Sequence, residues 1–441
     1  MEVLYHNLRG ENRGGREFLT ECRPHDTISP EVLLMERGYA GFTVTPKAER
    51  ALRAGHPWVY GAEVLSVSGE YAQGDIVDVY SRKGRWLGSG TVNDRSKIRV
   101  RLLSRNTNDR FDEAFFLRRI RYALEYRRTV MGEDYGCCRL IFGEADQFPG
   151  LTVDRFGDVL VTEVLSLGME LRKALLYRLL LQVLEEQGEP IRIIYERSDS
   201  PLRAKEGLEP WSGYVSLPGL LPEGDGHTEI RENGLRFDVD YVRGQKTGYF
   251  LDQKYNRLAA ARLAAGRRVL DCFTHTGAFA LNCAAHGAQR VTAADISPEA
   301  LQQAEQNARL NGLLDRIDFL RTDVFDLLTE TADRGQSPWD YIILDPPAFT
   351  KSSATADRAY RGYKEINRRA MQILPRGGYL ATCSCSHFMP AARFEEMLRE
   401  AASDAQVSLR QIEARQQAPD HPILWGVPET DYLKFYLFQV V

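Results

Sequence analysis

The spacing of apolar and polar positions changes three times along the chain, and each change predicts a new domain. From residue 41 to 110, apolar and polar positions alternate in short segments that are separated by glycine-rich turns. This period of two is typical of strands with one buried face, so we expect a small N-terminal β-barrel or sandwich. The predicted strands are residues 62–67, 75–80, 86–92 and 97–103.

The second stretch, residues 111–240, mixes both periods and predicts a central α+β domain. Apolar residues recur every three or four positions over residues 111–130, which predicts an amphipathic helix with a basic outer side. A second helix is expected near residues 170–187, and residues 234–240 are expected to pair with a preceding polar strand as a hairpin. Further strands are expected at residues 151–153, 159–164 and 192–195.

From residue 241 to 441, segments that predict strands alternate with helical segments. This order is typical of a doubly wound, mostly parallel sheet, so we expect a Rossmann-like C-terminal domain in a multidomain α/β protein. No long helix separates the last two strands, which predicts an antiparallel hairpin at the end. The seven expected strands are residues 268–273, 290–295, 317–322, 340–345, 378–384, 407–414 and 432–440.

Residues 1–40 are rich in charge and have no clear periodicity, so we expect a flexible N-terminal extension. They contain no apolar core of a secretory signal, and no apolar run in the chain approaches the roughly 20 residues that span a bilayer. We therefore expect a cytoplasmic protein that makes no membrane contact.

The cysteines and the charge distribution narrow the functional classes. None of the seven cysteines forms a Cys-x-x-Cys pair, so we expect reduced thiols and no metal site. The net charge is −4, but residues 41–105 hold eleven Lys and Arg against six Asp and Glu, a net of +5. A basic domain joined to an acidic remainder favours a protein that holds a polyanion with one part and performs chemistry with another.

Three aspartates, Asp271, Asp295 and Asp323, each end one of the first three strands of the C-terminal domain. Ligands of open α/β sheets bind at the carboxyl ends of the strands. Residues 271–277 contain one glycine, Gly277, instead of the three that a dinucleotide pyrophosphate needs. S-adenosylmethionine (SAM) has no phosphate and carries two cationic groups, so we expect SAM there.

Each position in this segment has an expected role. Asp271 would face the cations of SAM, Asp295 the ribose hydroxyls and Asp323 the adenine amino group, with Ile296 and Val324 beside the adenine. Phe273 and Thr274 belong to the same cofactor loop. A single aspartate at such a place is more often a helix N-cap; the succession of three favours SAM.

Asp345, Pro346, Pro347, Ala348 and Phe349 follow the fourth strand. Two prolines fix φ and remove backbone donors, so the turn is rigid and Asp345 is aimed at the polar edge of a planar base. Phe349 is expected to stack on that base or to wall it. The turn indicates a nucleobase or planar amide without identifying the atom that is methylated.

Cys385 follows the fifth strand and could indicate which ring atom is methylated. Carbon 5 of a pyrimidine is too weak a nucleophile to take the methyl group directly, whereas addition of a thiolate to C6 activates it. The other interpretation is a small buried core residue, as most free cysteines are. Cys383 lies two positions earlier and looks dispensable, because the strand could end between the two; His387 receives no role.

Several segments resemble the 23S rRNA (cytosine-C5) methyltransferase family that carries an N-terminal PUA domain. They are residues 53–60, 143–151, 195–199, 244–253 and 384–386. The resemblance implies that Phe250 and Asp252 help to hold SAM and that Cys385 is the nucleophile. The chain departs from the family pattern at Cys383 and at Ala348, where lysine is common, which leaves the target nucleotide open.

The resemblance also implies that Lys97, Arg99 and Arg101 contact RNA, because PUA domains bind RNA and basic side chains neutralise phosphates. The alternative is a solvated strand face. We expect formation of 5-methylcytosine in 23S rRNA, with Pro346 near the base and a homodimer among the possible assemblies. Three alternatives stay open: an amino- or purine-directed RNA methyltransferase, a non-catalytic RNA-binding protein that retains SAM, and a methyltransferase for small molecules.

Overall fold

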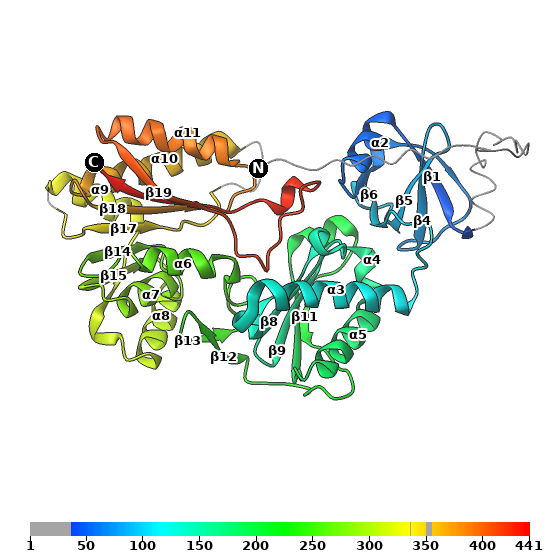
Figure 1. The fold of residues 1–441 in the computed structure, drawn as a ribbon, viewed down its shortest axis with the longest axis horizontal. Helices are drawn as coiled ribbons and strands as arrows, with labels where there is room; N and C mark the ends of the chain where they lie inside the picture. Colours follow the sequence, from blue (N-terminus) through cyan, green and yellow to red (C-terminus); the bar gives the residue numbers. More distant parts are fainter. Residues whose placement is uncertain (1–36, 336, 350–354) are drawn as a thin grey trace, which may run out of the picture.

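The computed structural model describes residues 37–335, 337–349 and 355–441 and arranges them in three domains (Figure 1). Most of the expected N-terminal extension, residues 1–36, lies outside the described residues. No helix in the described ranges is long and apolar enough to cross a membrane.

The N-terminal domain is a six-stranded sheet with one helix. The strands have the order β2-β6-β5-β4-β1-β3. The helix α2 (Pro46–Arg53), like β1 and β2, was not predicted. The side chain of Thr45 accepts a hydrogen bond from the backbone N–H of Ala48 at 3.3 Å, and Pro46 occupies the first turn. The strands are β1 (Ala40–Val44), β2 (Trp58–Tyr60), β3 (Val64–Ser68), β4 (Ile76–Ser81), β5 (Trp86–Val92) and β6 (Ile98–Ser104).

The central domain is a five-stranded sheet with the order β11-β10-β9-β8-β7. Helices α3 (Glu113–Met131) and α5 (Lys173–Glu186) pack against each other, and their apolar sides share one core with the sheet. The remaining elements are β7 (Cys137–Phe142), β8 (Leu151–Phe156), β9 (Val159–Val164), α4 (Leu167–Glu170), β10 (Ile193–Ser198) and β11 (Trp211–Tyr214).

The hairpin of β12 (His227–Glu232) and β13 (Leu235–Asp240) packs on the C-terminal domain, although the sequence analysis grouped it with the central one. The backbone N–H of Asp238 donates to Oδ1 of Asn307 at 2.9 Å. Phe237 and Val239 are buried in the same apolar cluster as the first strand of the C-terminal sheet. The hairpin therefore extends the C-terminal domain on the side of α8.

The C-terminal sheet has the order β16-β15-β14-β17-β18-β20-β19, and β20 alone runs antiparallel to both of its neighbours. Side chains alternate between its two faces: Tyr341 and Ile343 join the cluster under α6, α7 and α8, whereas Ile342 and Leu344 join the one under α9, α10 and α11. The strands are β14 (Arg268–Cys272), β15 (Arg290–Asp295), β16 (Ile317–Arg321), β17 (Tyr341–Leu344), β18 (Tyr379–Ser384), β19 (Leu409–Arg415) and β20 (Lys434–Val440). The helices are α6 (Lys254–Ala261), α7 (Ala278–Ala285), α8 (Pro298–Leu310), α9 (Val324–Arg334), α10 (Ala356–Ile373) and α11 (Ala391–Asp404).

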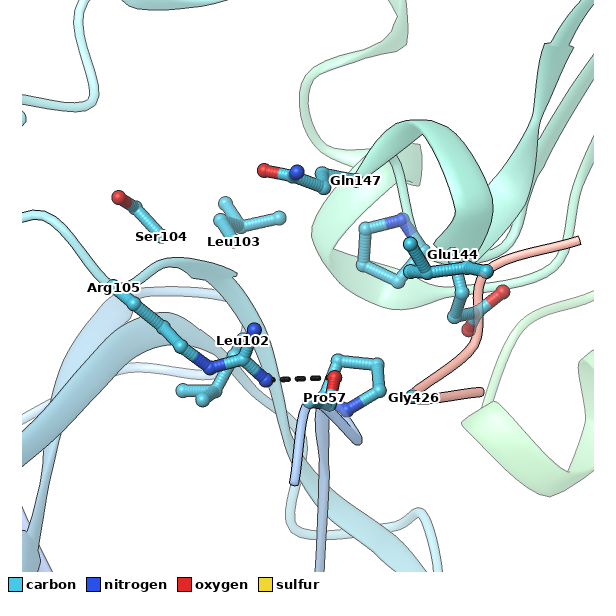
Figure 2. A pocket seen from close by; sticks show the side chains of 11 residues that line it. Pro57, Leu102, Leu103, Ser104, Arg105, Glu144, Gln147 and Gly426 are labelled. Carbon is cyan, nitrogen blue, oxygen red and sulfur yellow. Dashed lines mark hydrogen bonds between the residues drawn. The ribbon is translucent and has the colours of Figure 1, made fainter. Parts of the chain in front are cut away.

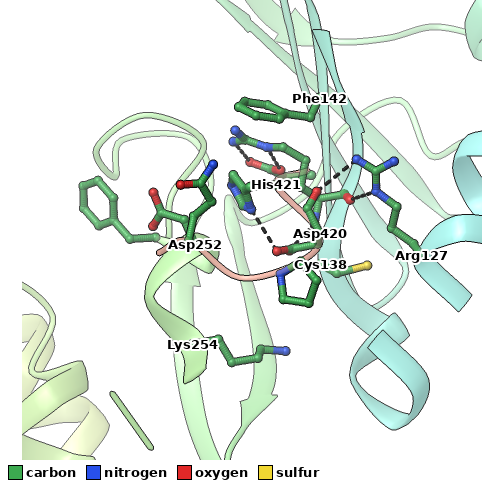
Figure 3. Close-up of polar contacts among 12 residues, drawn as sticks. Arg127, Cys138, Phe142, Asp252, Lys254, Asp420 and His421 are labelled. Carbon is green, nitrogen blue, oxygen red and sulfur yellow. Dashed lines mark hydrogen bonds and ion pairs between the residues drawn. The ribbon is translucent and has the colours of Figure 1, made fainter. Parts of the chain in front are cut away.

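The connection between β19 and β20, residues 416–433, reaches the other two domains, and we call it the bridging segment. Asp420 of this segment is fully buried, and its carboxylate accepts a hydrogen bond from the backbone N–H of Arg139 at 2.9 Å. The backbone carbonyl of Asp420 accepts a hydrogen bond from the side chain of Arg127 in α3 at 3.0 Å (Figure 3). Farther along, Glu429 lies 3.4 Å from the ring of His56 in the N-terminal domain. One connection thus ties all three domains together.

A small cavity of about 240 Å³ lies where the N-terminal domain, the central domain and the bridging segment meet (Figure 2). Pro57 and Leu102 come from the N-terminal domain, Glu144 and Gln147 from the central domain, and Gly426 from the bridging segment. A Cβ added at Gly426 would lie 2.7 Å from the Cα of Gly55, so the two backbones are in direct contact. The N-terminal domain is therefore packed against the rest of the molecule.

Candidate active site

A cavity of about 270 Å³ opens at the carboxyl ends of β14, β15, β17 and β18. Its wall brings together nine of the residues singled out in the sequence: Phe250, Asp252, Phe273, Thr274, Asp295, Ile296, Asp345, Pro346 and Cys385. Five others are not part of that wall: Asp271, Gly277, Asp323, Val324 and Phe349. Segments separated by more than 130 positions in the chain therefore meet in one cavity.

The loop after β14 is held in an unusual backbone conformation. Phe273 has φ of 62° and His275 has φ of 51°, in the left-handed region that side chains rarely adopt. The carboxylate of Asp271 holds the loop, since it accepts from Thr274 Oγ1 at 2.5 Å and from the backbone N–H of Ala280 at 3.0 Å. Asp271 thus acts on the cavity through the loop that it shapes.

Gly277 is required by space as well as by conformation. Its φ is 80°, and a Cβ there would lie 2.9 Å from both Ala304 Cβ and Leu281 Cδ1. The missing side chain allows α7 and α8 to approach each other closely behind the cofactor loop.

Asp295 and Ile296 form the side of the cavity at the end of β15. The carboxylate of Asp295 accepts from the backbone N–H groups of His275 and Ser297, both at 2.9 Å. Ile296 is 65% exposed, which is high for a large apolar side chain. A flat, partly apolar ring such as adenine would cover that surface.

Asp323 and Val324 do not have the places expected for adenine-binding residues. Asp323 is the N-cap of α9, and its Oδ1 accepts from the backbone N–H of Phe325 at 2.7 Å. Val324 is 3% exposed and packs in the core beneath α9. Asp323 therefore caps α9, as the alternative interpretation expected, and its contact with adenine stays a prediction.

Two buried carboxylate oxygens near the cofactor loop have no hydrogen-bond partner among the described residues: Oδ1 of Asp252 and Oδ1 of Asp271. The other oxygen of Asp252 accepts from the hydroxyl of Tyr432 at 2.6 Å. Burial raises the pKa of Asp271 to about 7. Asp252 lines the cavity with a lowered pKa, because His421 and Lys246 favour its charged form against burial, so an anionic side chain is available there for the ammonium or sulfonium group of SAM.

Asp345 ends β17 and is oriented by an amide relay. Gln253 Nε2 donates to Asp345 Oδ1 at 3.0 Å, and Asn256 Nδ2 donates to Gln253 Oε1 at 2.7 Å. Burial, with a contribution from the negative charge of Asp252, raises the pKa of Asp345 to about 6. The side chain can therefore act as a hydrogen-bond acceptor or, when protonated, as a donor toward a base.

Cys385 lines the cavity directly after the end of β18 at Ser384. Burial raises the pKa of its thiol to about 11; Lys246 and Lys434 oppose this shift, whereas Asp345 and Asp252 add to it. Cys383 is fully buried and interacts with Asp345 and Gln253. Cys383 therefore packs against the relay that orients Asp345, and its dispensability stays a prediction.

The three basic residues expected to contact RNA do not share one environment. Arg101 lies between domains: it forms an ion pair with Glu206 at 2.6 Å and stacks over the ring of Trp58. Arg99 pairs with Asp94, and Lys97 is exposed ahead of β6. Arg101 therefore stabilises the contact between the N-terminal and central domains, and Lys97 and Arg99 are left as candidates for RNA.

Phe349 does not wall the cavity either. Its ring lies 4.6 Å from that of Tyr363 in α10 and packs with the core beneath that helix. Of the Asp-Pro-Pro turn, Asp345, Pro346 and Pro347 reach the cavity.

Sequence reasoning missed several residues of the site. Residues 245–253 supply Gln245, Lys246, Tyr249 and Gln253 to the wall, although only Phe250 and Asp252 were singled out. The resemblance of residues 244–253 was a signal for the whole segment. Lys434, at the start of β20, gave no signal, because a single lysine in a strand has no distinguishing pattern.

Comparisons with known proteins agree with this architecture. A family model described as S-adenosylmethionine-dependent methyltransferase matches residues 220–438, and one described as PUA-like domain matches residues 42–105. These matches confirm SAM as the cofactor and the PUA-like fold of the N-terminal domain.

Two solved structures are similar in fold. A candidate SAM-dependent methyltransferase from Streptococcus mutans has a TM-score of 0.76 at 21% identity, over 91% of this chain and 100% of that one. A candidate methyltransferase complexed with SAH has a TM-score of 0.77 at 21% identity, with the same coverage. At this identity the likeness shows the fold alone.

Curated proteins are more similar in sequence. Ribosomal RNA large subunit methyltransferase I of Klebsiella pneumoniae (strain 342) is 40% identical over 398 residues, or 89% of this chain and 96% of that protein. The protein of the same name from Escherichia coli O139:H28 is 40% identical over 398 residues, or 89% of this chain and 97% of that protein. The chain therefore belongs to the family of ribosomal RNA large subunit methyltransferase I, whose members it matches in both its PUA-like domain and its SAM-dependent methyltransferase domain.

Proposed function

We propose that this protein transfers a methyl group from SAM to carbon 5 of a cytosine in large-subunit ribosomal RNA, with Cys385 as the covalent nucleophile. The observation that carries the proposal is the position of Cys385, on the same cavity wall as Asp345 and the buried carboxylate of Asp252. The names of the relatives supply the substrate class, and action on ribosomal RNA would place the protein in the cytoplasm.

Bound SAM would supply an electrophilic methyl group, and the residues for holding it are Phe250, Asp252, Thr274, Asp295 and Ile296. The Cys385 thiolate forms a bond from Sγ to C6 of the cytosine, and the electron pair of the C5=C6 bond becomes nucleophilic at C5. Asp345 forms hydrogen bonds with N3 and the 4-amino group of the cytosine and stabilises the charge that develops on the ring. After methylation a base removes the C5 proton, the C5=C6 bond re-forms, and the C6–S bond breaks to return the thiolate.

The target base must leave its stack to reach a thiol that lines a cavity. Two surface features support contact with RNA around that base. Lys97 is exposed on the N-terminal domain, and Trp425 on the bridging segment is 97% exposed, which leaves its ring free to stack on an unpaired base.

The test is Cys385→Ala with RNA that contains large-subunit sequences. We expect methyl transfer to be lost while SAM affinity stays within about twofold, because the thiol acts on the base and the removed group carries little cofactor contact. Cys137→Ala, a buried thiol in the central domain, is the matched control and keeps full activity. RNA that contains 5-fluorocytosine should trap the wild-type protein covalently, because fluorine at C5 cannot leave as a proton.

Full activity of Cys385→Ala would disprove the covalent mechanism. Methylation of an exocyclic amine or a purine, found by mass analysis of the modified nucleoside, would favour the alternative enzyme that needs no thiol. Absence of methyl transfer to any RNA by the wild-type protein would favour a non-catalytic, SAM-retaining RNA-binding protein.

A further inference from the structure

Lys434 is a buried cation beside the thiol of Cys385, and the mechanism described above assigns it no role. The residue is 5% exposed at the start of β20. Its Nζ donates to the backbone carbonyl of Ser386 at 2.6 Å and to that of Tyr432 at 2.7 Å. Burying an ammonium group is costly unless something nearby requires its charge.

Lys434 contacts both chain neighbours of Cys385, Ser384 and Ser386. In the antiparallel pairing of β18 and β20, Lys434 lies opposite Ser384, the residue before Cys385. Its side chain then reaches the carbonyl of Ser386, the residue after Cys385. One residue therefore holds both neighbours of the thiol: Lys434 pairs with Ser384 through the strand backbone and with Ser386 through its side chain.

The same short segment also contacts the cofactor side of the cavity. Tyr432 accepts from Lys434 through its carbonyl, and its hydroxyl donates to Asp252 at 2.6 Å. Leu433, between the two, lines the cavity. Residues 432–434 thus connect the proposed nucleophile with the carboxylate that faces SAM.

Titratable groups on several elements lie near the thiol, including Tyr363 of α10 and the buried thiol of Cys383. Lys246 and Lys434 favour the thiolate, whereas Asp345 and Asp252 oppose it. Among the described residues, no carboxylate forms an ion pair with Lys434; Asp431 and Cys385 are the acidic groups whose charge it senses. Burial lowers the pKa of Lys434 to about 8, so its charged form would itself gain from a thiolate nearby.

We propose that Lys434 is a positioning residue for the nucleophile: its ammonium group fixes the turn of Cys385 and stabilises the thiolate that forms when the thiol releases its proton to solvent. This inference rests on the proposed role of Cys385. The charge of Lys434 would also favour the return of the thiolate when the C6–S bond breaks, because Sγ regains its negative charge at that step.

The experiment measures the pH dependence of iodoacetamide alkylation at Cys385, read by peptide mass spectrometry on the full chain. In Lys434→Met we expect the alkylation curve to move to higher pH. The rate at neutral pH should fall about tenfold, because a neutral neighbour leaves a smaller fraction of the thiol ionised. Lys434→Arg keeps a cation and is expected to stay close to the wild-type curve.

Lys254→Met is the matched control, because Lys254 is also fully buried and donates to a backbone carbonyl, that of Cys137, at 2.9 Å. It should lose stability without moving the Cys385 curve. If Lys434→Met does not fold, Lys434→Gln, which keeps a donor without the charge, takes its place. A Cys385 curve that is unchanged in the folded neutral variant overturns the proposal for Lys434.

Alkylation requires no methyl transfer, so the test separates the two claims. If the alkylation curve shifts but Cys385→Ala is fully active, Lys434 affects the thiol, but this effect has no role in catalysis. If the alkylation curve does not shift but Cys385→Ala is inactive, Cys385 is still the nucleophile, and Lys434 does not assist it.

Discussion

At the scale of single residues, three buried or partly buried carboxylates, Asp252, Asp271 and Asp345, lie in or next to the site. Asp252 and Asp271 each bury one oxygen without a partner among the described residues, and Asp345 lies close enough for Asp252 to raise its pKa. Like charges in a dry cavity destabilise one another. The sulfonium and ammonium groups of SAM outnumber its single carboxylate and would relieve this repulsion, so cofactor binding and local stability should be coupled.

Asp271→Asn tests this coupling. In the folded protein burial raises the pKa of Asp271 to about 7, whereas the unfolded chain ionises near its ordinary value of about 4. Between these values the folded state binds more protons, so the contribution of Asp271 to the free energy of unfolding falls as the pH rises. Without SAM, we expect the melting temperature of the wild type to fall relative to that of Asp271→Asn between about pH 4 and pH 7.

Saturating SAM should reduce this difference, because positive charge bound against the cofactor loop favours the ionised form of the carboxylate that holds this loop. Thermal unfolding of both proteins across the pH range, with and without SAM, provides the measurement. Parallel melting curves for wild type and variant at every pH would mean that the Asp271 carboxyl ionises normally and does not respond to the cofactor.

At the scale of elements, the sequence predicted the central strands of the C-terminal sheet well because they are buried on both faces. The expected strand at residues 290–295 coincides with β15 (Arg290–Asp295), since a continuous apolar run between polar ends has clear limits. Short edge strands such as β2 (Trp58–Tyr60) and β11 (Trp211–Tyr214) were missed, because three or four residues carry too little periodicity.

The candidate site was predictable wherever a residue ends a strand. Asp295, Asp345 and Cys385 follow strands of one sheet, and the topology alone brings them to one edge. Asp323 also follows a strand, but the helix that comes next uses its carboxylate. Lys434 comes to the site from the far end of the chain because β20 lies between β18 and β19. The absence of a long helix predicted the antiparallel hairpin of β19 and β20, but no local pattern indicated that β20 pairs with β18.

The two interpretations of Asp323, helix cap or adenine ligand, predict different variants. Asp323→Ala removes the cap of α9 and should cost about 1 kcal/mol in the free energy of unfolding. Asp323→Ser keeps a capping oxygen and should restore most of that stability. Denaturant unfolding measures the first effect, and calorimetric titration with SAM measures cofactor affinity, which we expect to stay within about twofold in Asp323→Ser. A stable Asp323→Ser that binds SAM much more weakly would return Asp323 to the cofactor.

At the scale of the whole molecule, the bridging segment makes the orientation of the domains part of the active site. Tyr432 on this segment bonds Asp252, and Asp420 is held by Arg127 and Arg139 of the central domain. The N-terminal domain joins the same framework through Arg101 and Glu206. An RNA held by the N-terminal domain would therefore meet the cavity at a fixed distance, because the interfaces on both sides are buried and polar.

The basic residues of the N-terminal domain should separate into two functions. Lys97→Gln with Arg99→Gln is expected to weaken RNA retention and to lower the slope of log affinity against log salt by about 1.4, as two phosphate contacts on single-stranded RNA would give. The melting temperature should change little, since Lys97 is exposed and Arg99 lies at the surface.

Arg101→Gln should instead lower the melting temperature, because it leaves buried Glu206 without its cation. Arg309→Gln with Arg334→Gln removes the same charge from exposed positions on α8 and α9 and should alter neither property. Filter binding across salt concentrations reads the slopes, and an unchanged slope in the Lys97 and Arg99 variant would place the RNA on another surface.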